Sequence, residues 1–171
     1  MPWPGASAGP RLGGMTTSRV PAPDIGRLSL FIGRWRGPGW GRWGAARFGY
    51  VEELEFIHAG KPHLVYAQRT HASDDGRPLH AERGFWRLAG EAVELVIAQG
   101  IGVAETSLAE WDSDILCARS TALLLTPTAK PVTAVRRTYE PRGEILRCTL
   151  EMSTDGGDVL PHLEAHLARV R

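Results

Sequence analysis

Gly33-Arg34-Trp35-Arg36-Gly37-Pro38-Gly39 begins a long run of strand-like sequence. Glycine inside a strand marks a tight bend or the close approach of another backbone, and strands that close a β-barrel need such bends. Near the C-terminus, Pro161-His162-Leu163 places a histidine in an otherwise apolar strand. Because neutral imidazole binds iron well, the two segments together predict a small β-barrel that holds a haem iron against one histidine.

Short strand-like segments separated by turn signals fill the chain between these two motifs. Asp74-Asp75-Gly76 and Pro141-Arg142-Gly143 are typical of hairpin connections. About ten consecutive short strands without a long helix indicate an all-β, antiparallel barrel or sandwich, and the barrel is favoured because closure removes exposed edges. The expected strands are residues 34–43, 48–58, 63–71, 79–88, 93–99, 102–110, 115–120, 132–140, 144–153 and 159–170.

The N-terminal residues 1–23 are rich in Pro, Gly, Ser and Ala and show almost no apolar periodicity. Such a segment cannot repay the entropy of ordering, so we expect a disordered tail, with Met15 as an alternative start of the protein. A single domain is expected over residues 24–171.

A short helix is predicted directly after this tail. Asp24 is placed as an N-cap, and Gly33 is placed to end the helix in a left-handed conformation. An apolar face at helical spacing would plug the closed end of a barrel, and it consists of Ile25, Leu28, Phe31 and Ile32.

Charge and cysteine content exclude several classes of function. The 20 basic and 19 acidic residues give a formal net charge of +1, which provides no electrostatic footprint for nucleic acid or an anionic membrane surface. No apolar run is long enough to span a bilayer and no secretory signal is recognisable, so we expect a cytoplasmic protein. Cys117 and Cys148 are expected as free thiols in a reducing compartment, with a disulfide between adjacent strands as the alternative.

Glu52 breaks the apolar face of its strand. The even positions carry Phe48, Tyr50, Leu54 and Phe56, so Glu52 would point inside with them. A buried carboxylate needs a partner. We expect a structural ion pair with Arg69 or Arg83 on a neighbouring strand.

The motifs resemble those of the nitrobindins, which are haem-binding β-barrels related in shape to fatty-acid-binding proteins and lipocalins. The family's G-x-W-x-G-x-G signature is matched by Gly33, Trp35, Gly37 and Gly39. The similarity covers residues 28–170. It includes Gly76-Arg77-Pro78-Leu79-His80-Ala81-Glu82, Gly102-Val103-Ala104-Glu105, Thr128-Ala129-Lys130-Pro131-Val132-Thr133-Ala134 and Pro161-His162-Leu163-Glu164-Ala165.

The resemblance implies a cofactor, a ligand and an activity. His162 corresponds to the family's axial ligand of one five-coordinate ferric haem b at the barrel mouth. The implied activity is that of a peroxynitrite isomerase, which converts peroxynitrite to nitrate, with nitric oxide as a further ligand. The protein is expected to be a monomer or a homodimer.

One segment departs from the family pattern. Nitrobindins usually follow the glycine motif with Y-P-T-I-x-P-F, whose threonine approaches the haem. This chain instead reads Trp43-Gly44-Ala45-Ala46-Arg47-Phe48, which is one residue shorter. Ala45 lies nearest the threonine position and has no hydroxyl to donate.

Other polar residues have both functional and ordinary interpretations. Lys130 could guide an anionic substrate or a haem propionate, or be a solvated loop lysine. His166 would share the face of His162 in a regular strand, yet lies too far along it for a second ligand and is expected to be exposed. Trp40 and Trp43 are candidates for the cavity mouth. Surface or rim positions are expected for His58, His63, His71 and His80, with a structural hydrogen bond at His80.

Three classes of function remain open from the sequence. The first is the haem-dependent isomerase, in which the iron does the chemistry and the protein supplies ligation and access. The second is a lipocalin-like module that binds an apolar small molecule in the barrel. The third is a haem or nitric oxide carrier without turnover.

Overall fold

The structure is a computed structural model that describes residues 24–171. The expected tail at residues 1–23 and the alternative start at Met15 lie outside the described residues. Within the described residues, no helix is long and apolar enough to cross a membrane.

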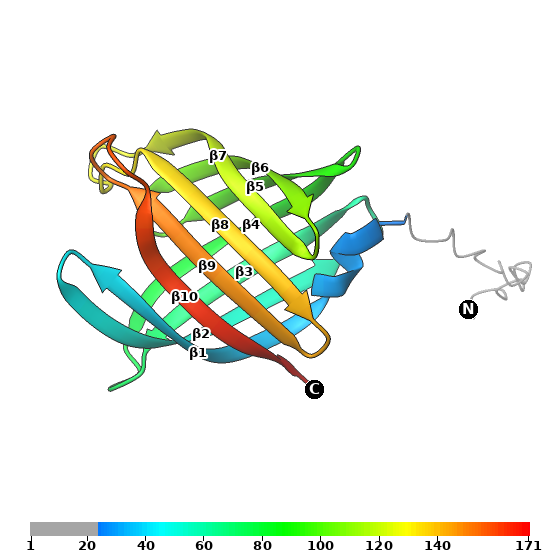
Figure 1. The fold of residues 1–171 in the computed structure, drawn as a ribbon, viewed down its shortest axis with the longest axis horizontal. Helices are drawn as coiled ribbons and strands as arrows, with labels where there is room; N and C mark the ends of the chain where they lie inside the picture. The colour runs from blue at the N-terminus through cyan, green and yellow to red at the C-terminus, as the bar shows by residue number, and fades with distance from the viewer. Residues whose placement is uncertain (1–23) are drawn as a thin grey trace, which may run out of the picture.

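Ten antiparallel strands form one closed barrel, as the sequence predicts (Figure 1). Each strand pairs with its neighbours in the chain, and β1 pairs with β10 to close the sheet. The strands are β1 (Gly33–Trp43), β2 (Ala46–His58), β3 (His63–Ala72), β4 (Pro78–Ala89), β5 (Ala92–Gln99), β6 (Val103–Asp112), β7 (Ile115–Leu125), β8 (Ala134–Arg142), β9 (Ile145–Ser153) and β10 (Leu160–Val170).

The glycines of β1 let neighbouring groups approach its backbone closely. A Cβ on Gly37 would lie 2.1 Å from the main-chain oxygen of His166 on β10. A Cβ on Gly39 would lie 2.3 Å from the ring of Tyr50 on β2. Because real Cβ atoms do not make such contacts, only glycine allows β1 to pack here, in agreement with the bend predicted at the closure.

The predicted short N-terminal helix is confirmed. Residues Gly26–Phe31 form it as a 3-10 helix, η1. Its first residue, Gly26, has φ +53°, outside right-handed helical geometry, and its N–H donates to Asp24 Oδ1 at 2.7 Å in a local turn. Ile32 is 37% exposed and so leaves the expected apolar face. Gly33 does have positive φ, at +120°.

Phe31 of η1 closes one end of the barrel. Leu28 and Phe31 are fully buried, and Trp35 Nε1 donates to the main-chain oxygen of Phe31 at 2.8 Å. Figure 1 shows η1 at the end of the barrel opposite the β1–β2 turn and the β9–β10 loop. The ring of Phe31 lies within 6.3 Å of four aromatic rings, those of Phe56, Trp86, Trp111 and Tyr139.

The two cysteines are free thiols, as favoured from the sequence. Cys117 lies on β7 and Cys148 on β9, with β8 between these strands. The alternative of a disulfide between adjacent strands is therefore excluded.

Candidate functional site

His162 occupies an irregular position of β10. The pairing of β10 with β9 shifts between Pro161 and Leu163, so His162 is the extra residue of a β-bulge. Leu163 and His162 both line the same cavity, although neighbouring residues of a regular strand face opposite sides. The bulge therefore turns His162 toward the interior, a common role of bulges beside functional sites.

The backbone of β1 fixes the ring of His162. Nδ1 lies 2.5 Å from the main-chain oxygen of Arg42, and because a carbonyl only accepts, Nδ1 carries the proton. The ring also packs edge-on against Trp43 and Phe48. The remaining nitrogen, Nε2, keeps its lone pair and is the atom available to a metal.

Burial keeps this imidazole neutral. Desolvation lowers the pKa of His162 below 6.5, and the nearby charges of Lys130 and His80 lower it further. The hydrogen bond to Arg42 opposes these effects without reversing them. A neutral imidazole with a fixed tautomer is the form in which histidine binds iron.

A cavity of about 410 Å³ lies beside His162, which is within the size range of small-molecule and cofactor sites. Its apolar wall comes from several strands and from the loop after β7, and includes Phe48, Leu79, Ile101, Val132, Leu150 and Met152. Its polar side includes Gln68, Thr70, His80, Glu82 and Gln99.

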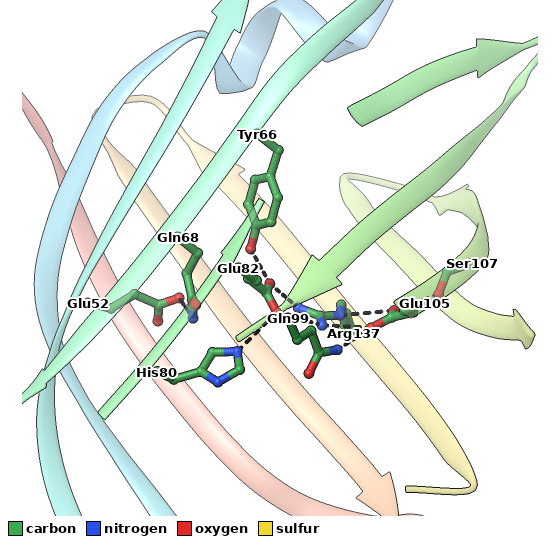
Figure 2. A network of polar contacts seen from close by, with 9 residues as sticks. All are labelled: Glu52, Tyr66, Gln68, His80, Glu82, Gln99, Glu105, Ser107 and Arg137. Carbon is green, nitrogen blue, oxygen red and sulfur yellow. Dashed lines mark hydrogen bonds and ion pairs between the residues drawn. The ribbon is translucent and has the colours of Figure 1, made fainter. Parts of the chain in front are cut away.

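A buried ionic cluster lies next to the polar side of this cavity (Figure 2). Arg137 of β8 donates to both carboxylate oxygens of Glu82 on β4, at 2.7 and 3.1 Å. The same guanidinium donates to Glu105 on β6, at 2.8 and 3.2 Å. Four further side chains complete the hydrogen bonding of the two carboxylates: those of Tyr66, His80, Gln99 and Ser107.

One arginine between two glutamates leaves this cluster with a net negative charge. Burial raises the pKa of Glu82, but the charge of Arg137 and hydrogen bonds from His80 and Arg137 outweigh it and bring the pKa to about 2. Desolvation lowers the pKa of Arg137, but the two carboxylates outweigh this effect and raise the pKa well above its ordinary value. Glu82 and Arg137 therefore remain charged at neutral pH.

The predicted ion pair of Glu52 with Arg69 or Arg83 is wrong. Glu52 is buried, as predicted, but its side chain accepts from Gln68 Nε2 at 3.0 Å. Arg69 instead pairs with Glu53 on the outside of the barrel, and Arg83 is also exposed. The reason is the register: Thr70 lies opposite Glu52, so the odd-numbered Arg69 faces the other side of the sheet.

Lys130 and Trp43 meet at the cavity. The Nζ atom of Lys130 lies 3.9 Å from the centre of the Trp43 ring, and both residues line the cavity. Ala45 lies in the exposed turn between β1 and β2 and does not line this cavity. The structure thus brings Lys130 and His162 to one site and leaves Ala45 outside it.

The remaining aromatic and histidine predictions divide between the cavity and the outer surface. His166 is exposed and stacks on Trp40 outside the cavity, so it does not share the face of His162. The bulge at His162 is the reason. His80 makes the expected hydrogen bond, to Glu82 at 3.3 Å, and also lines the cavity. Half-buried positions are occupied by His58, His63 and His71.

Sequence reasoning missed the ionic cluster. Glu82 and Glu105 stand at inward positions of strands that also carry apolar inward residues, such as Trp86 and Val103. That pattern could have marked them as buried carboxylates. Arg137 alternates in the same way with Val135 and Tyr139 on β8.

Comparisons with known proteins agree with this geometry. Residues 24–169 match the family model described as THAP4-like, heme-binding beta-barrel domain. The chain belongs to this family. The resemblance to the nitrobindins is thereby confirmed.

Two mycobacterial relatives and one solved structure are similar to this chain over most of its length. Peroxynitrite isomerase 2 of Mycobacterium avium (strain 104) is 39% identical over 87% of this chain and 96% of the relative. Peroxynitrite isomerase 1 of Mycobacterium tuberculosis (strain ATCC 25618 / H37Rv) is 38% identical over 88% of this chain and 97% of the relative. The crystal structure of Rv2717c from M. tuberculosis is similar with a TM-score of 0.77 and 38% identity, covering 84% of this chain and 95% of that one.

The residues present fit the family's haem. The cavity offers one neutral imidazole whose second nitrogen is committed to a carbonyl, the usual arrangement of a histidine metal ligand. Its wall is largely apolar, as a macrocycle requires, and Lys130 supplies a cation at its edge.

Proposed function

We propose that the chain binds one haem b through Nε2 of His162 and isomerises peroxynitrite to nitrate. The observation that carries this proposal is the bulge, which turns His162 to the cavity while Arg42 holds its other nitrogen. The two relatives named peroxynitrite isomerase support the choice of reaction.

The protein's part in this reaction is ligation, orientation and exclusion of water. His162 would hold the iron in one orientation because its ring is fixed by Arg42, Trp43 and Phe48. Apolar side chains such as Val132 and Met152 would line the cavity that holds the macrocycle and keep water away from it. When bound, ferric haem supplies a Lewis-acidic iron with an open position that assists O–O cleavage.

Lys130 would bind an anionic group at the edge of the cavity. Its ammonium lies over the Trp43 ring and within reach of the cavity. The group it meets would be a haem propionate or the entering peroxynitrite anion. Electrostatic attraction of this kind favours anions over neutral molecules.

Because this chain lacks the family's threonine hydroxyl, its affinity for haem would depend more on His162. Ala45 is exposed in the β1–β2 turn and cannot donate a hydrogen bond to the cofactor. Retention of haem would therefore depend on the iron–imidazole bond and on the apolar wall. Nitric oxide, a diatomic ligand, would reach the same open iron position.

Rapid mixing of haem-loaded protein with peroxynitrite tests the proposal. We expect faster decay than in buffer, with nitrate formed at the expense of nitrite. Haem binding without faster decay would favour the carrier of haem or nitric oxide. Failure to bind haem would favour a lipocalin-like module for an apolar molecule.

A further inference from the structure

Glu52 is a buried carboxyl group that the proposed chemistry does not use. It lies on β2 with its side chain inside the barrel, and it is 6% exposed. On the neighbouring β1, Gly37 is opposite and contributes no side chain. The titratable or charged groups around it are Tyr50 on its own strand, Tyr66 on β3, His80 and Glu82 on β4, Arg137 and Tyr139 on β8, and Cys148 on β9.

A proton on Glu52 would complete the hydrogen bonding of Gln68. Gln68 Nε2 donates to Glu52 Oε1 at 3.0 Å, and Figure 2 shows the two side chains pointing toward one another. Gln68 Oε1 is buried and has no hydrogen-bond partner within residues 24–171. An ionised carboxylate only accepts, whereas a carboxylic acid carries an O–H that can donate to this oxygen. Rotating the Gln68 amide does not help an ionised Glu52. Oε1 would then lie against the carboxylate, and both groups can only accept hydrogen bonds.

The nearby charges do not compensate for an ionised Glu52. Arg137 already pairs with Glu82 and Glu105, so no ion pair to Glu52 is formed by this guanidinium. Burial raises the pKa of Glu52 to about 7, and Glu82 contributes in the same direction. The hydrogen bond from Gln68 and the charges of Arg137 and His80 act in the opposite sense. The group therefore changes its charge near neutral pH.

Gln68 connects this pair to the haem cavity. It lines the cavity beside His162, and it also lines a small internal space of about 20 Å³ next to Glu52. Such a space has room for about one water molecule. Tyr50, Leu150 and Leu163 also line both spaces, so these four side chains lie between Glu52 and an anion in the larger cavity.

We propose that Glu52 and Gln68 form an internal acid–amide pair that binds one proton, and that binding of an anion in the cavity promotes uptake of this proton from solvent. The carboxylate becomes a carboxylic acid when the anion enters, so the interior gains less negative charge. By linkage, protonation of Glu52 must strengthen anion binding by the same factor. The pair would thus make the cavity bind anions more tightly on the acidic side of neutrality.

The proton itself can be observed without haem. Infrared spectra of the haem-free protein should show a carboxylic-acid C=O band at about pH 6 that disappears by about pH 8, one unit either side of the pKa of about 7. Glu52→Gln should abolish the band. Glu53→Gln should retain it, because Glu53 lies on the same strand but pairs with Arg36 and Arg69 outside the barrel. A wild-type spectrum identical to that of Glu52→Gln at about pH 6 would overturn the proton-binding pair.

The Gln68 contact has its own signature. Gln68→Leu removes the hydrogen-bond partner of the acid, so the C=O band of protonated Glu52 should move to higher wavenumber than in the wild type. An unchanged band position would show that Gln68 is not the partner of the acid.

Fluoride binding to the ferric haem-loaded protein tests the coupling, which rests on the proposed haem site. Wild-type affinity should weaken by about five-fold or more between about pH 6 and about pH 8, beyond any change seen in Glu52→Gln. Ionisation of other groups affects both proteins equally and cancels in this comparison. Identical pH profiles in the two haem-loaded proteins would overturn the coupling, whereas failure to load haem would refute the haem site and leave the infrared result standing.

Discussion

Nδ1 of His162 lies 2.5 Å from the main-chain oxygen of Arg42, so the closing pair of strands, β1 and β10, itself sets the tautomer of the candidate ligand. The acceptor is a backbone atom, which side-chain substitution at residue 42 does not remove. The other nitrogen remains free for iron, and the orientation of the ring follows from barrel closure.

Acid should weaken haem binding with a midpoint below pH 6.5. Burial lowers the pKa of His162, so protons compete with iron for this imidazole at lower pH than they would for an exposed histidine. Haemin affinity measured across this range checks the prediction. The measurement is best made in the Glu52→Gln variant, because ionisation of Glu52 then does not add to the pH dependence of haemin affinity. A loss of affinity centred above pH 6.5 would contradict it.

Lys130→Ala should weaken haemin binding by a few-fold, on the order of 1 kcal/mol, because an exposed cation near an anionic group contributes modestly. The loss should be smaller at high salt, where the attraction is screened. Lys61→Ala is the matched control, since Lys61 lies in the exposed connection after β2 and does not line the cavity. Equal effects of the two substitutions would argue against a role for Lys130.

Gly37→Ala should destabilise the barrel by about 3 kcal/mol or prevent folding, because its Cβ would clash with backbone that cannot move aside. Denaturant unfolding measures the loss. Gly100→Ala serves as the control, since its Cβ would meet only one atom, at 3.4 Å. Comparable stability of the two variants would show that β1 does not need glycine at its closure with β10.

Arg137→Leu should cost about 3–5 kcal/mol at neutral pH, because it leaves two buried carboxylates without their cation. In the wild type, the lowered pKa of Glu82 contributes stability above pH 4.5 that is lost as pH falls toward about 2. In the variant both carboxylates are destabilised, so acidification below neutrality should restore stability rather than reduce it.

A charge-free variant separates the loss of pairing from the loss of packing. Glu82→Gln, Glu105→Gln and Arg137→Met together should unfold at a higher denaturant concentration than Arg137→Leu alone at neutral pH. If the triple variant is as unstable as the single one, unpaired charge is not the cause.

The barrel could be predicted because its signals are local. Alternation and turn residues mark each strand, and glycines mark the closure at Gly37 and Gly39. The short N-terminal helix could also be predicted, because Leu28 and Phe31 mark one buried face. Their spacing fits an α-helix and a 3-10 helix alike, so it does not reveal the 3-10 form that the structure has.

The site depends on strand pairing, which a single sequence does not specify. Strict alternation sends His162 and His166 to one face, and only the bulge against β9 separates them. The same limit applies to Glu52, whose opposite residue, Thr70, is known only from the register. The motif therefore identified His162 as the candidate ligand, and the structure showed that its side chain points into the cavity.

Titration of haemin into the haem-free protein, followed by its absorption spectrum, tests the bond from His162 to iron most directly. We expect an intense Soret band that saturates at one haem per chain, is lost in His162→Ala and is retained in His166→Ala, whose side chain lies outside the cavity. An undiminished band in correctly folded His162→Ala would contradict the proposed ligand and, with it, the haem site built around the bulge.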